Sequence, residues 1–319
     1  MILYKYVPAE RIDILENESI RYTQPRLLND PFEMTPHFGA LLSSNEIIGV
    51  LNFRRIREMV RETKQAAILP GIVQSFVAMG LWVFLQFSST IKNNMLAVID
   101  TLSRKMKKEW DAQMEKHLTS TIGVLSLSAK HDNLSMWSHY ASNHSGLVIA
   151  VDETAAIFHE SLSDKDELRH LRQVVYSKHK PSLTLQTASG VEFLLRKSVE
   201  WEHEDEWRII KTLDSANAVG LAISPTGGLV DSDVRLFTLP ASAIQGVVLG
   251  ARMAAIYRER LLNLIRTDVR YRHVWIKEAR LQKDKFALEF VRLPGRPQYH
   301  PVPEIKISAQ DLPEVAAPP

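Results

Sequence analysis

The sequence predicts an α+β protein with many short strands, and three observations lead to this fold class. Apolar runs typical of strands lie on both sides of a long middle segment. The first of these runs is at residues 2–6, and a continuous apolar run follows the middle segment at 146–152. The middle segment, 44–117, instead carries apolar side chains at helical spacing. Neither GxGxxG nor GxxxxGK(S/T) occurs, which argues against a dinucleotide-binding doubly wound sheet and against an ATPase.

The first elements alternate between strand and helix. Residues 2–6 predict a strand, and Pro8 marks the start of a short helix over 9–16. A second strand is expected over 20–23, followed by a loop with turn chemistry at Asn29-Asp30-Pro31. The later part predicts strands at 121–128, 146–152, 171–176, 234–238, 246–250, 273–279 and 287–292, a short helix within 131–140, helices at 184–197 and 253–266, and a loop at 224–228.

The middle block contains no charged residue between positions 65 and 91. That length would suffice to cross a bilayer, but Pro70 and the amides of Gln74 and Gln86 favour a buried helix or a self-association surface. Residues 66–87 are therefore expected to pack on a long amphipathic helix over 95–118 and to form a homo-oligomer contact. Contact with a membrane through 66–87 is the alternative that we favour less.

Composition limits the function classes. The chain has 319 residues, a net charge of +2 and no cysteine, which excludes disulfides, thiolate metal sites and a cysteine nucleophile. The N-terminus lacks a signal-peptide pattern, so we expect a cytoplasmic protein. The expected organisation is an α+β core formed by 1–43 and 121–300, a helical insertion over 44–120, and a disordered proline-rich tail over 301–319.

The segment from Trp201 to Ile210 carries the strongest functional signal. Two tryptophans and several ionisable residues precede an apolar pair, a combination that fits the edge of a pocket. If Glu204 and Glu206 lie on one strand, their carboxylates face the same side and raise one pKa. An ion pair with Arg208 is the alternative interpretation of either glutamate.

Several motifs together resemble a bacterial family known as domain of unknown function 2971. The resemblance extends over most of residues 2–265 and rests on Leu3-Tyr4-Lys5-Tyr6, Asn29 to Glu33, Leu125 to Ser128, Asn133 to Tyr140, Gly146 to Asp152, Lys197, Trp201, Glu204, Glu206, Trp207, Arg208 and Val247 to Arg252. The family name supplies no reaction.

A second resemblance, at the level of architecture, is to ADP-ribosyltransferases. These enzymes place a histidine or arginine on a first strand, an aromatic or hydroxyl motif on a second strand, and a glutamate on a later strand. Tyr4-Lys5-Tyr6, Tyr22-Thr23 and Glu204-Asp205-Glu206 follow that order, although Lys5 or a tyrosine would have to replace the histidine or arginine. The resemblance implies a split β-sheet core, NAD as the substrate, and ADP-ribosyl transfer to a macromolecule or NAD hydrolysis in a toxin or phage-defence effector.

This resemblance assigns roles to twelve side chains. The residues expected in catalysis are Glu206, Glu204, Tyr22 and His139, and those expected to hold NAD are Tyr4, Lys5, Tyr6, Asn29, Asp30, Trp137, Tyr140 and Arg208. A carboxylate near the ribose would stabilise an oxocarbenium-like transition state, while aromatic rings would stack on nicotinamide. Asn29 and Asp30 also fit ordinary turn chemistry, and His139 fits a structural hydrogen-bonding role.

Two alternatives from other classes remain open. A metal-dependent nuclease would use Asp30, Glu33, His139 and Glu206, although their spacing indicates no metal site and none is assigned. A non-enzymatic module would act by oligomerising or by touching a membrane. The macromolecular target, whether protein or nucleic acid, is not identified by the sequence.

Overall fold

The computed structural model describes residues 1–35, 111–113, 116–118, 120–161, 166, 168–180, 191–223 and 229–295. The loop at 224–228, the tail at 301–319 and nearly all of the block at 44–120 lie outside these ranges, as does the expected association surface at 66–87. In the part of the chain that is described, no helix is both long enough and apolar enough to cross a membrane.

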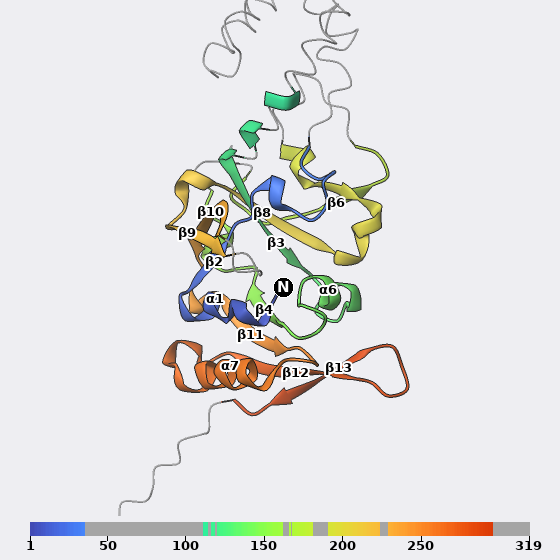
Figure 1. Ribbon diagram of the computed structural model, residues 1–319, viewed down its shortest axis with the longest axis vertical. Coiled ribbons are helices and arrows are strands. Elements are labelled where there is room, and N and C mark those ends of the chain that lie inside the picture. Colours follow the sequence, from blue (N-terminus) through green and yellow to red (C-terminus); the bar gives the residue numbers. More distant parts are fainter. Residues whose placement is uncertain are drawn as a thin grey trace, which may run out of the picture.

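An eight-stranded sheet forms the body of the protein and confirms the α+β class (Figure 1). The strand order is β13-β12-β11-β4-β1-β3-β8-β5. These strands are β1 (Ile2–Val7), β3 (Ile122–Ser128), β4 (Leu147–Asp152), β5 (Arg172–Gln173), β8 (Glu206–Thr212), β11 (Ile244–Leu249), β12 (Trp275–Leu281) and β13 (Leu288–Leu293). Neighbouring strands are antiparallel, except that β11 and β12 run parallel.

The parallel pair is joined by α7 (Ala255–Thr267), as a parallel connection requires a crossover. Leu261, Leu262 and Ile265 are buried on this helix and join the main core cluster. The other labelled helices in the described part of the chain are η1 (Ala9–Ile12), α1 (Asp13–Glu16), η2 (Pro25–Leu27), α6 (Leu134–His139), η3 (Ala156–Phe158), η4 (Val191–Leu195), η5 (Val199–Glu204), η6 (Leu213–Ser215), η7 (Ala241–Ala243) and η8 (Val269–Tyr271), where η denotes a 3₁₀ helix.

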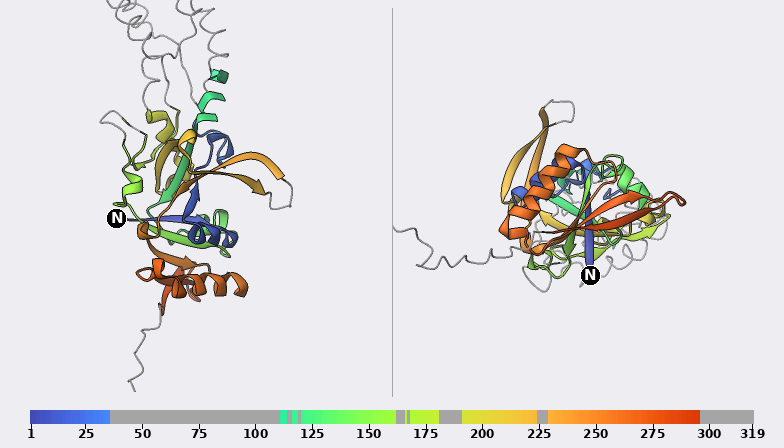
Figure 2. Two further views of the ribbon diagram at one scale, coloured as in Figure 1. Left: turned by 90° about the vertical axis from the view of Figure 1, so that its left-hand side faces the viewer. Right: turned by 90° about the horizontal axis from the view of Figure 1, so that it is seen from below.

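Two smaller sheets accompany the main sheet. One has the order β2-β10-β9, formed by β2 (Ser19–Arg21), β9 (Ala218–Ile223) and β10 (Leu229–Thr238), and its β9–β10 ribbon projects from the body (Figure 2). The other is a parallel pair of β6 (Val175–Ser177) and β7 (Arg196–Ser198).

β1 and β3 are neighbours in the sheet, but they pair only at Tyr4 and Ser128. On its other side, β1 pairs with β4 along its whole length. At the opposite end of β3, Val124 bridges to Thr23 instead of to β1. β1 and β3 therefore separate along most of their length, and the candidate site lies in the opening between them.

Three details differ from the sequence-based expectation. The strand expected over 171–176 is two strands, because buried Val174 bonds to the carbonyl of Glu206 and the chain then leaves β8 to pair with β7. The expected helix over 184–197 instead ends in η4 and β7, and 181–190 lie outside the described residues. β9 was not expected from the sequence.

Candidate functional site

A pocket of about 230 Å³ opens between β1 and β3, and we call it the β1–β3 pocket. Its walls come from β1, from β3 and from the loop after η2, and its polar base comes from β7, η5 and β8. The lining residues are Tyr4, Lys5, Tyr6, Thr23, Leu27, Leu28, Asn29, Glu33, Val124, Ser126, Leu127, Ser128, Met136, Tyr140, Lys197, Glu204 and Glu206.

Five buried charged side chains lie at the base of this pocket, and we call them the ion cluster: Glu33, Lys197, Glu204, Glu206 and Arg208. The Nζ atom of Lys197 lies 2.9 Å from Glu33 Oε1, 2.6 Å from Glu204 Oε2 and 3.0 Å from Glu206 Oε2. Arg208 donates from Nε to Glu206 Oε1 at 2.7 Å and from Nη2 to Glu206 Oε2 at 2.9 Å, and it also bonds Glu33. Three carboxylates therefore face two cations away from water.

The two glutamates converge for a reason other than strand alternation. Glu204 is the last residue of η5, and Asp205 then adopts a left-handed conformation with φ of 45° before Glu206 begins β8. Aspartate tolerates that conformation better than most residues. The Ser128 hydroxyl fixes the turn by donating to the carbonyl of Glu204 at 2.6 Å. The expectation that both carboxylates project from one strand is therefore wrong, although both reach Lys197.

The ionisation of the ion cluster follows from burial opposed by ion pairing. Burial raises the pKa of Glu206, but Arg208 and Lys197 outweigh this and lower it to about 2. Burial also raises the pKa of Glu33, and there Arg208 and Lys197 do not fully compensate. The Oε1 atom of Glu33 lies close to Lys197 yet has no aligned hydrogen bond in the described structure. Glu206 is thus firmly ionised, whereas Glu33 is protonated more easily than Glu206.

Tyr140 connects the ion cluster to the rim of the pocket. Its hydroxyl donates to Glu204 Oε1 at 2.6 Å and accepts from the Asn29 amide at 2.6 Å. Burial beside Glu204 raises the pKa of Tyr140, so it remains a neutral donor. Tyr140 follows helix α6, and the Asn133 side chain positions that helix. Asn133 accepts a hydrogen bond from Met136 N and donates one to the carbonyl of His203. Asn29 and Glu204 are therefore held together across different parts of the chain.

Lys5 is the cation on the β1 wall. Its Nζ donates to the carbonyl of Ser126 on β3 at 2.9 Å, across the opening between the two strands. Burial lowers the pKa of Lys5 to about 8, although Glu206 and Glu204 act in the opposite direction. Beside it, Tyr4 stacks on His131 at 5.0 Å between ring centroids, and the Tyr6 hydroxyl donates to the carbonyl of Lys130.

The structure brings most of the expected site residues together. Tyr4, Lys5, Tyr6, Asn29, Tyr140, Glu204 and Glu206 line the β1–β3 pocket, and Arg208 lies directly behind Glu206. The ion-pair interpretation of Glu206 with Arg208 is confirmed. The polar and aromatic clusters noticed in separate segments of the sequence therefore belong to one place in the fold.

Four expected residues lie elsewhere. Tyr22 is buried in the main core against Phe237, and Trp137 is buried behind Tyr6, donating its Nε1 hydrogen to the carbonyl of His131. His139 is exposed on α6 and lines none of the described pockets. Asp30 lines the adjacent pocket and accepts from Phe32 N at 2.8 Å, so it performs turn chemistry rather than pairing with Arg208.

Two central residues had no assigned role in the favoured sequence-based site. Lys197 was noticed only within the family resemblance, and Glu33 within that resemblance and in the nuclease alternative. A lysine and a glutamate in sequence give no sign that they will meet, because their contact depends on the long-range packing of the N-terminal loop on β7. Lys197 Nζ also lies 5.1 Å from the centroid of the Trp201 ring. Trp201, at the start of the 201–210 segment, was therefore the one feature of the sequence that marked the neighbourhood of Lys197.

The described residues contain no group of three or more histidine, aspartate or glutamate side chains arranged to hold a metal ion. The set expected for a nuclease does not share one pocket, since Asp30 lines the adjacent pocket and His139 lines neither. Glu33 and Glu206 are close, but Lys197 and Arg208 already occupy their oxygens.

Residues 136–209 match the family described as "Protein of unknown function (DUF2971)". The matched segment contains Lys197, Glu204, Glu206 and Arg208, so it covers most of the ion cluster. The family resemblance drawn from the sequence is supported over this segment. No curated protein and no solved structure matches the chain. The comparisons thus offer no support for the ADP-ribosyltransferase resemblance.

Proposed function

We propose that the β1–β3 pocket binds NAD and promotes cleavage of the bond between nicotinamide and ribose, with transfer of ADP-ribose to a macromolecule or to water. The observation that carries the proposal is the convergence of Glu204, Glu206 and Tyr140 at the base of a pocket with aromatic walls. The match to a family without an assigned reaction neither supports nor opposes this chemistry.

The electrostatics of the ion cluster fit a transition state that gains positive charge. When the glycosidic bond breaks, its electron pair leaves with the nicotinamide nitrogen, and the ribose acquires oxocarbenium character. Glu206, ionised because its pKa is about 2, would stabilise that charge. Within the ion cluster three carboxylates face Lys197 and Arg208, and Lys5 on the pocket wall balances the third carboxylate while it is charged.

The neighbouring polar groups suit the rest of the ligand. Glu33 also lines the pocket, and its Oε1 atom lies 2.9 Å from Lys197 Nζ. Tyr4 and Tyr140 provide aromatic surface against which nicotinamide can pack. The attacking hydroxyl or water bonds to the ribose C1′ and gives its proton to Glu204, whose other contacts are Tyr140 and Lys197.

The proposal is tested by incubating the full chain with NAD and measuring free nicotinamide by chromatography. Nicotinamide release that requires Glu206 supports it. A parallel incubation uses DNA and RNA with Mg²⁺ or Mn²⁺. Metal-dependent cleavage of nucleic acid without NAD consumption contradicts the proposal and favours the nuclease alternative. Inactivity in both assays, with assembly lost on deletion of residues 44–120, favours the non-enzymatic module.

A further inference from the structure

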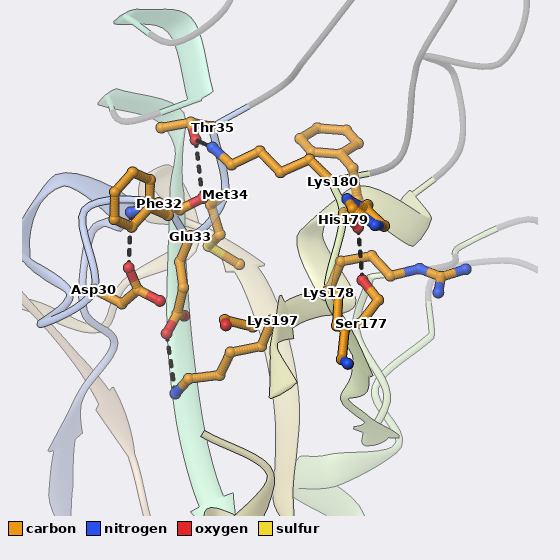
Figure 3. Close-up of a pocket in the computed structure, with 13 residues that line it drawn as sticks. Asp30, Phe32, Glu33, Met34, Thr35, Ser177, Lys178, His179, Lys180 and Lys197 are labelled. Atoms are coloured by element: carbon orange, nitrogen blue, oxygen red, sulfur yellow. Dashed lines mark hydrogen bonds and ion pairs between the residues drawn. The ribbon is translucent and has the colours of Figure 1, made fainter. Parts of the chain in front are cut away.

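A second pocket of about 260 Å³ adjoins the ion cluster and is rich in cationic side chains (Figure 3). We call it the basic pocket. Lys178, His179 and Lys180 line it from the turn after β6, and Arg196 and Lys197 line it from β7. The Ser177 hydroxyl fixes that turn by donating to the carbonyl of His179 at 2.7 Å. Three cationic side chains outside the ion cluster, those of Lys178, Lys180 and Arg196, therefore line one cavity together with a histidine.

The acidic residues in the basic pocket are committed to other contacts. Asp30 accepts from the backbone of Phe32, and Glu33 pairs with Arg208 and Lys197. Within the described structure, no ion pair forms on Lys178 or Arg196. Exposed lysines by themselves are ordinary solvated surface. Lys178 and Arg196 instead lie at a cavity, with no carboxylate paired to either of them among the described residues, and this arrangement indicates an anionic ligand.

An aromatic ring stands beside these cations. The Phe32 side chain is 70% exposed, although it is large and apolar. Lys180 Nζ lies 5.7 Å from the centroid of that ring and also bonds the Thr35 hydroxyl, so it lies over the ring. Figure 3 shows Phe32 and Lys180 on facing segments of the pocket. An exposed ring next to ammonium groups suits a base attached to phosphates.

We propose that the basic pocket binds the diphosphate of a nucleotide, with Phe32 in contact with the base. Lys178 and Lys180 would neutralise the phosphate oxygens through charge-assisted hydrogen bonds. Glu33 and Lys197 line both the basic pocket and the β1–β3 pocket. A ligand with a diphosphate and a further ribose can therefore extend from one pocket into the other. This last step rests on the proposed function, whereas binding of the diphosphate does not.

Isothermal titration calorimetry on the full chain tests the proposal with three probes: inorganic pyrophosphate, ADP and adenosine. Pyrophosphate and ADP are expected to bind, and adenosine is expected to bind much more weakly. Lys178→Ala should weaken both anions roughly tenfold, as loss of one hydrogen bond to a charged group implies. Phe32→Ala should weaken ADP but leave pyrophosphate unchanged. Lys283→Ala, at an exposed lysine far along the sequence in the β12–β13 turn, is the matched control.

Each remaining outcome overturns the proposal. The proposal is overturned if neither pyrophosphate nor ADP binds at millimolar concentration. It is also overturned if Lys178→Ala and the parent bind these anions equally well. Binding of a single-stranded oligonucleotide without binding of ADP would assign the cations to a nucleic-acid surface instead. The two proposals fail separately: diphosphate binding without nicotinamide release removes only the proposed reaction. Nicotinamide release with an unchanged KM for NAD in Lys178→Ala removes the extension of NAD from one pocket into the other and leaves the proposed reaction standing.

Discussion

Glu33 and Arg208 form a buried ion pair although 175 positions separate them in the sequence. The pair attaches the loop after η2 to β8 beneath the β1–β3 pocket. Lys197 contacts the other oxygen of Glu33 and so joins β7 to the same point. Assembly of the candidate site therefore depends on opposite charges meeting in the interior, where each charge is costly unless it is paired.

Replacing Lys197 with methionine tests that dependence. The variant leaves three buried carboxylates with Arg208 as the remaining cation of the cluster, so the free energy of unfolding should fall by about 3–5 kcal/mol at pH 7. Urea denaturation followed by circular dichroism measures the change. Lys285→Met, at an exposed position, is the control and should be close to neutral. Equal loss in the two variants would show that Lys197 has no special structural role.

Glu206→Gln should make stability less sensitive to acid. Because the folded-state pKa of Glu206 is about 2 against an ordinary value of 4.5, its ionised form stabilises the fold at neutral pH by about 3 kcal/mol. For a carboxyl with a lowered pKa, this contribution is complete above pH 4.5 and is lost as pH falls towards 2. The stability difference between parent and variant should shrink over that window. A difference that stays constant between pH 6 and pH 3 would contradict the assignment.

The catalytic prediction separates the two glutamates. On NAD, Glu206→Gln should lower the rate of nicotinamide release about 100- to 1,000-fold, as loss of an electrostatic stabiliser typically does. Glu204→Gln should have a smaller effect. The bonds of Glu206 to Arg208 and Lys197 also make some loss of stability unavoidable in Glu206→Gln. Rates are therefore divided by the folded fraction, measured by denaturation. Equal corrected rates for parent and Glu206→Gln would remove Glu206 from the mechanism.

Lys5 predicts the pH dependence of the same reaction. Burial lowers its pKa to about 8, so it is mainly charged at pH 7 and neutral at pH 9. A positive charge on the pocket wall opposes an oxocarbenium-like transition state, and the rate should therefore rise with pH through about 8. Lys5→Met should remove this rise and leave a flat profile between pH 7 and 9. An unchanged rise in Lys5→Met would assign it to another group.

The sequence predicted where the strands lie and which segments contribute to the candidate site, but not which side chains contact one another. Strand patterns located β1, β3 and β4 to within a residue or two, because burial on both faces leaves continuous apolar runs. Glu204 and Glu206 of the 201–210 segment line the β1–β3 pocket, whereas Trp201 and Trp207 line none of the described pockets. The geometry of this segment was not predictable, since the left-handed turn at Asp205 replaces strand alternation. Tyr22 and Trp137 were assigned to the site because aromatic residues suit both a ligand and a core, and here the core holds them.

The last prediction concerns the backbone that follows β11. Gly250 lies so close to neighbouring chain that an added Cβ would fall 2.2 Å from the carbonyl oxygen of His144 and 2.6 Å from that of Gly146. Both atoms belong to the backbone, and Gly250 N also donates to the Gly146 carbonyl at 2.9 Å, so the contact cannot be relieved by rotating a side chain. Gly250→Ala should therefore destabilise the fold by about 2 kcal/mol or more, within the range found for overpacking. Thermal and urea denaturation measure the loss. Gly295→Ala is the matched control, because nothing described lies within 4 Å of its added Cβ. A Gly250→Ala variant as stable as Gly295→Ala would show that β11 and the 144–146 turn are not packed this closely in solution.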